Sequence, residues 1–300
     1  METQQTGLRT ADREPVVQGK FIPYDVHCIQ SDGEKLWIDP PMQGNEAALD
    51  RGNDRVFYTH LPWRRGVAPQ SGEILLGQDD VRVMRFGKDL RTCFLREGYP
   101  KDEPFPMNDS SERNGRVRAI CNGESLYVGK CEIRCIHTPG PTPGHTCLYL
   151  PQEQTLFAGA LLSQPSKMSW LGHEPQALEN LLKSLEEIKE LPAKKVFPAW
   201  EENTSLKDRA EQISRTCYFR VLELLRLVQD HPGLTAYELA SRFSRMEKAW
   251  SELSPQRRLE AMEETMAYLS YLRDRDYVRA VTENEVRINV PGKRRLTDVV

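Results

Sequence analysis

Residues 117–162 constrain the fold more than any other stretch of the chain. They contain strand-forming segments separated by turn signals at Asn122-Gly123, Gly129 and Pro151-Gln152-Glu153. Short runs of β-branched and aromatic residues between such turns are typical of strands joined by hairpins. Between two of these strands, residues 137–145 read HTPGPTPGH, in which repeated Pro-Gly pairs mark a turn. We therefore expect a β-rich region interrupted by a proline-glycine loop.

Strands and helices alternate through the first two hundred residues. A helix is predicted from the apolar positions 178, 181, 182, 185 and 188, and a shorter one over 46–52. Residues 97–115, with three prolines, predict an exposed loop. Further strands are predicted at 24–30 and 35–39 around Ser31-Asp32-Gly33, and at 55–60, 73–77, 81–86 and 194–200.

The pattern becomes helical from about residue 205. A long amphipathic helix is predicted over 213–229, and Thr235 with Glu238 forms a capping-box pattern. Ser254-Pro255 is typical of a helix start, and two strands follow around Glu283-Asn284. Helix, helix, helix and hairpin is the order of a winged-helix domain. We expect four parts: a tail over 1–20, a main domain over 21–204, a winged-helix-like domain over 205–290 and a tail over 291–300.

Composition excludes several classes of protein. The net charge is -3, and residues 205–300 hold 17 Lys and Arg against 15 Asp and Glu, a weak balance for a nucleic-acid reader. No apolar run reaches the ~18 residues that span a bilayer, so no membrane partner is expected. Residues 1–20 do not resemble a signal peptide, which predicts a cytoplasmic protein. The seven cysteines include no C-x-x-C pair and predict neither a disulfide scaffold nor a zinc ribbon.

A family resemblance rests on IHTPGPTPGHTCLYLPQEQTLFAGALL, residues 136–162. This stretch resembles the TPGHTxGH and F-x-G-D motifs of the metallo-β-lactamase-fold hydrolases. KLWIDPP, VFYTHLPWRRG and KKVFPAWEEN resemble the other landmarks of that family, in the same order. The helical region resembles the C-terminal part of the β-lactamase-like-protein-2 subgroup. The resemblance implies an α/β fold: a four-layer αββα sandwich with a smaller, α-helical, winged-helix-like C-terminal domain.

The same resemblance places all but one of the family's metal-ligand positions on residues that are unsuitable as ligands. His60 matches the first histidine of T-H-x-H-x-D-H, and His145 matches a trailing histidine that is not a ligand in the family. Proline and alanine carry no donor lone pair, and arginines add positive charge where two dications would bind. We therefore expect no metal cofactor. The substituted ligand positions are Pro62, Arg64, Arg65, Pro141, Ala160 and Trp200.

The function predicted from these residues is binding without catalysis. We expect a pseudoenzyme that acts as a protein partner or as a subunit of an assembly. One alternative is a hydrolase of a thioester, ester or phosphodiester with a rebuilt active site. A second alternative is a nucleic-acid-associated protein that uses the winged-helix-like domain, although nucleic acid is the disfavoured partner.

Two interpretations of the vestigial cleft remain open from sequence. In the first, Arg64 and Arg65 pair with Glu201 and Glu202, so that the cleft is filled. In the second, the cleft binds an anionic small molecule. That ligand would contact Arg64 and Arg65 through hydrogen bonds and would stack on Trp63 and Trp200. Catalysis by the Cys147 thiol, with His145 as its partner, is less favoured than simple packing of these two side chains.

Overall fold

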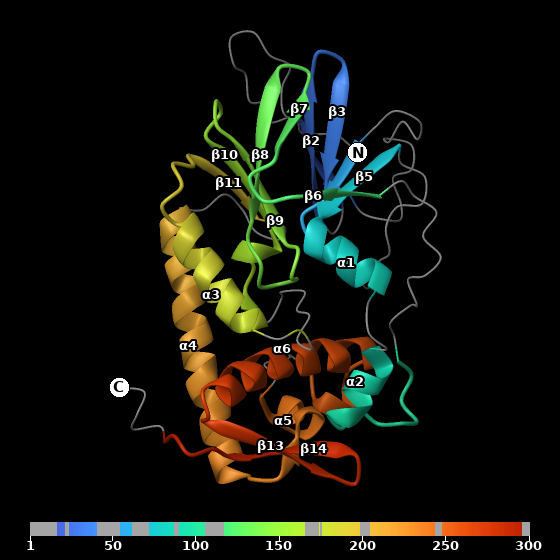
Figure 1. Cartoon of the computed structure of the whole chain (residues 1–300), viewed down its shortest axis with the longest axis vertical. Helices are drawn as coiled ribbons and strands as arrows, with labels where there is room; N and C mark the ends of the chain where they lie inside the picture. Colours follow the sequence, from blue (N-terminus) through green and yellow to red (C-terminus); the bar gives the residue numbers. More distant parts are fainter. Residues whose placement is uncertain are drawn as a thin grey trace.

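A computed structural model of the chain describes residues 17–21, 24–40, 55–61, 72–86, 90–105, 117–165, 174, 176–198, 205–243 and 248–295. Two β-sheets stack face to face, helices lie on their outer faces, and a helical region with a small third sheet adjoins them (Figure 1). This is the predicted αββα arrangement with a C-terminal helical region. No helix in the described part of the chain is long and apolar enough to cross a membrane.

The first sheet has the order β1-β2-β3-β4-β5-β6. Its first three strands are antiparallel, and β3 to β6 are parallel to one another. Parallel strands end at the same edge of a sheet, so the residues after β3, β4 and β5 are brought together. The strands are β1 (Val17–Phe21), β2 (Tyr24–Ser31), β3 (Glu34–Ile38), β4 (Arg55–Tyr58), β5 (Glu73–Gly77) and β6 (Val117–Ile120).

The second sheet has the order β11-β10-β9-β8-β7. Helix α3 (Ala177–Ile188) packs its apolar residues on the outer face of this sheet, as their helical spacing predicts. The predicted hairpins in 117–162 are confirmed, although β6 belongs to the first sheet. The strands are β7 (Ser125–Val128), β8 (Cys131–His137), β9 (Thr146–Leu150), β10 (Thr155–Gly159) and β11 (Lys195–Pro198).

Successive side chains of the central strands point alternately to the two faces of each sheet, and this alternation creates the layers. In β4, Phe57 points into the core between the sheets, whereas Val56 and Tyr58 pack on the outer side near α1. In β10, Phe157 joins the core between the sheets, whereas Leu156 joins the cluster under the helices. Strands buried on both faces read as nearly continuous apolar runs, which explains the sequences RVFY and TLFAG.

The C-terminal region contains helices and the third sheet, of order β12-β14-β13. The capping box is confirmed, because Thr235 N–H donates to Glu238 Oε2 over 2.8 Å and Glu238 N–H donates to Thr235 Oγ1 over 3.2 Å. Ser254 caps the last helix, with Pro255 in its first turn. The elements are α4 (Leu206–Asp230), β12 (Leu234–Thr235), α5 (Ala236–Phe243), α6 (Pro255–Asp274), β13 (Val278–Glu283) and β14 (Val286–Pro291).

One prediction for the first domain is wrong, and a second is wrong only in the exposure of two residues. The strand predicted at 81–86 belongs to helix α1 (Gln78–Phe86), whose acidic first turn suits the positive end of the helix dipole. The exposed loop predicted at 97–115 begins with two buried residues, Glu97 and Tyr99. They follow a helix that the pattern did not predict, α2 (Leu90–Arg96), whose Phe94 packs in the cluster of the C-terminal helices.

Glu97 ties α2 to the C-terminal region. Its carboxylate accepts hydrogen bonds from Arg273 of α6 and from Arg287 of β14 at 3.0–3.2 Å. The segment after α2 therefore packs with residues more than a hundred positions further along the chain.

At the N-terminal end, β1 begins inside the predicted tail 1–20, because pairing with β2 needs backbone groups and not apolar side chains. The helix predicted at 46–52 lies outside the described residues.

We predict an acid-dependent loss of stability that originates at His27. This residue is 6% exposed and packs against Phe157 and Phe197, with ring centroids 5.2 and 5.0 Å away. Burial lowers its pKa to about 4. The unfolded chain protonates the same ring near pH 6.5, so the contribution of neutral His27 is lost as pH falls from about 6.5 to 4. Relative to His27→Phe, the wild type should lose about 2–3 kcal/mol between pH 7.5 and 4.5 in denaturant titrations.

The exposed His231 supplies the control. A His231→Gln variant should follow the wild-type pH curve. Parallel curves for the wild type and His27→Phe would show that His27 is not held neutral in the fold.

Candidate functional site

The candidate site lies where strands of both sheets end. The strand-end loops, residues 39–40, 59–61, 138–145 and 159–163, meet at this edge. Thr146, at the start of β9, donates its backbone N–H to the carbonyl of Thr59 over 2.8 Å and so joins the sheets here. In α/β folds, ligands bind outside the carboxyl ends of the parallel strands. The loops are therefore the place to look for chemistry.

Asp39 fixes the loop that carries His60. Its carboxylate accepts the Thr59 backbone N–H over 2.8 Å and the Thr59 hydroxyl over 2.6 Å. Because that hydroxyl gives its single proton to Asp39, it acts as the acceptor toward His60 Nδ1, 3.0 Å away. The Nδ1 atom of His60 therefore carries a proton, and Nε2 is the basic nitrogen of the ring.

Asp80, in the first turn of α1, links two of these loops to the helix. Its Oδ2 accepts the Leu61 N–H over 2.7 Å and the Thr142 hydroxyl over 2.6 Å, while Oδ1 accepts the Gly144 N–H over 2.7 Å. The side chain is fully buried, and burial raises its pKa to about 6 against the lowering effect of these hydrogen bonds. At neutral pH Asp80 is a carboxylate that anchors both loops.

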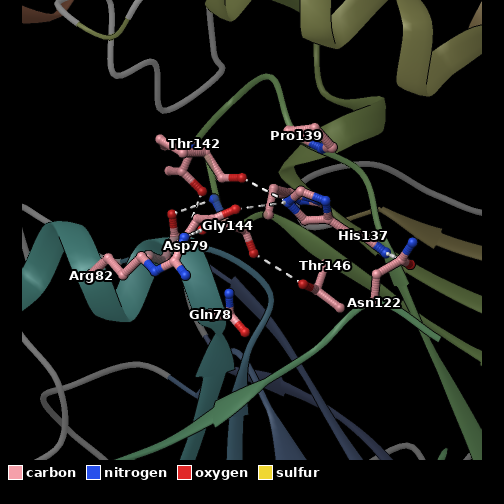
Figure 2. A network of polar contacts seen from close by, with 12 residues as sticks. Gln78, Asp79, Arg82, Asn122, His137, Pro139, Thr142, Gly144 and Thr146 are labelled. Carbon is pink, nitrogen blue, oxygen red and sulfur yellow. Dashed lines mark hydrogen bonds and ion pairs between the residues drawn. The ribbon is translucent and has the colours of Figure 1, made fainter. Parts of the chain in front are cut away.

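The loop 138–145 passes close over α1 (Figure 2). His137, at the end of β8, places Nε2 2.7 Å from the Pro143 carbonyl, and its backbone N–H donates to Asn122 Oδ1 over 3.0 Å. Gly144 approaches so closely that a Cβ at this position would lie 2.2 Å from the Asp80 backbone nitrogen. A glycine at position 144 is thus required by packing against α1.

Pro141 and His145 are both buried in this loop. The Nδ1 of His145 lies 2.9 Å from the Thr138 hydroxyl, which is also 3.2 Å from Cys147 Sγ. Burial lowers the pKa of His145 well below its ordinary value and raises the pKa of Cys147 to about 12. A neutral imidazole beside a protonated, fully buried thiol is a packed structural group, and it is not an activated nucleophile.

Ala160 directly follows β10 and is fully buried at the start of a short 3-10 helix, Ala160–Leu162. The preceding residue, Gly159, has a φ of +49°, and a Cβ there would lie 2.2 Å from Thr59 Oγ1. The end of β10 therefore packs directly against the loop of His60. The ring of His60 also stacks 6.0 Å from that of His145.

Six of the predicted cleft residues lie outside the residues that the structure describes. They are Pro62, Trp63, Arg64, Arg65, Trp200 and Glu201. The two interpretations of the cleft, filled by Arg-Glu pairs or open to an anion, depend on them and stay predictions. The structure brings together the other four positions: His60, Pro141, His145 and Ala160.

The described residues do not fit a dinuclear metal centre. Both carboxylate oxygens of Asp39 are engaged with Thr59. Pro141 and Ala160 offer no donor atom. In the part of the chain that the structure describes, no three His, Cys, Asp or Glu side chains are grouped so as to hold a metal ion.

Sequence reasoning missed Asp39, Asp80 and Thr138. The strand KLWID predicts no role for Asp39 at its end, and the Pro-Gly pattern predicts only a turn at Thr138. Asp80 escapes prediction because the residues that follow it, 81–86, have the pattern of a strand and not of a helix. An acidic residue just after a strand, at the edge where other strands end, was the available signal.

We predict that Asp80 is the most sensitive position among these loops. In Asp80→Asn, the amide places a donor against backbone N–H groups and loses at least one hydrogen bond. The unfolding free energy should fall by about 2–3 kcal/mol. Urea titration at pH 7 measures this loss.

Asp79→Asn is the matched control. The carboxylate of Asp79, the residue before Asp80, is 38% exposed and pairs with the exposed Arg82. It should change stability by less than about 0.5 kcal/mol. Equal effects for the two variants would refute the anchoring role of Asp80.

Comparison with known proteins agrees with this fold. Residues 121–200 match the family model of the Metallo-beta-lactamase superfamily. The structure of a metallo-beta-lactamase family protein from Thermus thermophilus superposes with a TM-score of 0.70 at 22% identity, covering 89% of this chain and 93% of that one. The chain therefore has the fold of this neighbour, and its residues 121–200 are similar to the Metallo-beta-lactamase superfamily.

Curated relatives match shorter stretches. A hydroxyacylglutathione hydrolase from Rhizobium johnstonii is 29% identical over 85 residues, which are 25% of this chain and 33% of the relative. A beta-lactamase-like protein 2 homolog from Caenorhabditis elegans is 24% identical over 139 residues, 44% of each chain. The matched stretches span 24% to 52% of the lengths of such relatives.

Proposed function

We propose that this metallo-beta-lactamase-fold protein acts by binding and not by the metal-dependent hydrolysis typical of the fold. The observation that carries the proposal is the packing of Ala160 and Pro141. Both stand where the family has metal ligands, both are buried, and neither has a lone pair to donate. The sequence supports the same conclusion at Pro62, Arg64, Arg65 and Trp200.

Protein groups hold the strand-end loops together. Asp80 anchors the loops 59–61 and 138–145, and Asp39 anchors Thr59 beside His60. A fold whose loops are fixed by buried carboxylates does not need metal ions as cross-links. This supports a scaffold that keeps its shape for binding, as a partner or subunit in a protein assembly.

We infer that residues 205–290 form a winged-helix-like module used in packing and not in reading nucleic acid. The order α4, β12, α5, α6, β13, β14 supports the assignment. In such modules the third helix enters the DNA groove. Here nine consecutive residues of α6, 261–269, are buried, which covers every direction around its axis. An anionic small molecule in the cleft remains a candidate ligand.

The proposal predicts that metal has no effect on stability. Thermal unfolding of the purified protein should give the same Tm, within about 1 °C, after exhaustive chelation and after addition of excess zinc. A protein that needs its metals would lose several degrees on chelation. Such a loss would overturn the proposal.

An Ala160→Asp variant tests the ligand position directly. A carboxylate at this fully buried position should lower the unfolding free energy by about 3 kcal/mol or more. Zinc should not restore it, because the surrounding donors are missing. Ala158→Asp, at an equally buried position on β10, is the control for burial alone. Zinc rescue of Ala160→Asp, without rescue of the control, would show a site that can still bind metal.

Hydrolysis is the alternative function, and one observation favours it. The chain Asp39, Thr59, His60 leaves Nε2 as the basic nitrogen of a half-buried ring, which is the arrangement of an oriented general base. The matched relatives include proteins named as hydroxyacylglutathione hydrolases. The alternative substrate class is therefore a thioester of that kind.

A thioester assay separates the two functions. We expect no release of glutathione from hydroxyacylglutathione above the buffer rate, with or without zinc. Turnover that His60→Gln abolishes, and that His231→Gln leaves unchanged, would establish the hydrolase. Turnover equal in all three proteins would point to a contaminant.

A further inference from the structure

Strand β13 presents a free edge on the surface. It is the last strand of the third sheet and pairs with β14 on one side, while no described strand pairs with its other side. Five of its six residues are exposed, on both faces, so the described helices leave this strand uncovered. The hairpin lies at the end of the molecule remote from the two large sheets (Figure 1).

This edge lacks two of the features that usually prevent edge pairing, a bulge and a proline. Natural edge strands are interrupted by bulges, prolines or inward charges. Here the register with β14 continues without a shift from Val278 to Glu283, and the strand contains no proline. Its outer backbone N–H and C=O groups can therefore form a regular ladder with another strand.

The side chains of β13 are complementary to themselves. Arg279, Val281 and Glu283 alternate along the strand and so share one face. If a second β13 pairs antiparallel about a two-fold axis at Val281, each Arg279 lies opposite Glu283 of the other copy. The two Val281 side chains, 41% exposed in the single chain, then lie opposite each other. Opposite charges flanking an apolar pair favour this register.

The other face of the strand allows the same pairing. In this register Ala280 lies opposite Thr282, and both side chains are small. The two-fold arrangement uses the same patch on both copies, which closes the assembly at two chains. No other register of β13 against itself places both charges opposite their complements.

We propose that a second copy of this chain pairs with β13 through this edge and forms a continuous six-stranded sheet from two three-stranded sheets. The proposal concerns a surface separate from the strand-end loops and does not depend on the function of the cleft. A six-residue edge is a small interface, so the dimer should be weak, with a Kd of roughly 10–100 µM.

Charge reversal tests this pairing. Sedimentation velocity from about 5 to 500 µM should show a reversible dimer of the wild type. Arg279→Glu and Glu283→Arg each place like charges opposite one another twice, and each should raise the Kd about tenfold or more. Both positions are exposed, so circular dichroism and Tm should stay close to the wild type.

Two recombinations make the result specific. The double variant Arg279→Glu with Glu283→Arg restores opposite charges and should dimerise like the wild type. An equimolar mixture of the two single variants also restores them, and it should form mixed dimers while neither variant alone dimerises in this range.

Other outcomes overturn the proposal. A wild type that stays monomeric to about 500 µM has no such edge pairing. A wild type that gains mass only when a DNA duplex is added also lacks the proposed pairing. A dimer that both single variants retain uses another face. Loss of the dimer without recovery in the mixture shows that the charges do not pair across the strands.

Discussion

The buried carboxylate of Asp80 is the interaction on which the arrangement of the strand-end loops depends. It accepts the N–H groups of Leu61 and Gly144 and the hydroxyl of Thr142 within 2.7 Å. These donors come from loops that follow strands in different sheets. A side chain in the first turn of α1 thereby connects the two sheets where they end, beside the Thr146–Thr59 backbone hydrogen bond. One carboxylate can accept from all three donors because its two oxygens offer about four lone-pair sites.

The strand-end loops are held together by further protein groups. Asp39 and Asp80 hold these loops through hydrogen bonds to their carboxylates. The end of β10 packs through Gly159 against Thr59. Pro141 and Ala160 are both buried within this packing, and their side chains offer no donor atom to a metal ion.

The sequence predicted the C-terminal helices and their caps because these depend on local patterns, whereas the layers were expected from the family resemblance. The Thr235-Glu238 box and Ser254-Pro255 each act within a few residues. It failed at 81–86, where VRVMRF has the composition of a strand but follows an acidic helix start. It also failed at Glu97, because the arginines that make its burial tolerable lie at 273 and 287. The site was predicted as a set of substitutions, while the carboxylates that hold its loops, Asp39 and Asp80, act through contacts distant in sequence.

Metal content is the most direct test of the central claim, that the strand-end loops are held by protein groups and bind no catalytic metal. The untagged protein, equilibrated with zinc and iron and then desalted, should contain less than about 0.1 equivalent of either metal by plasma mass spectrometry. Retention of about one to two equivalents per chain, lost together with structure on chelation, would contradict the claim.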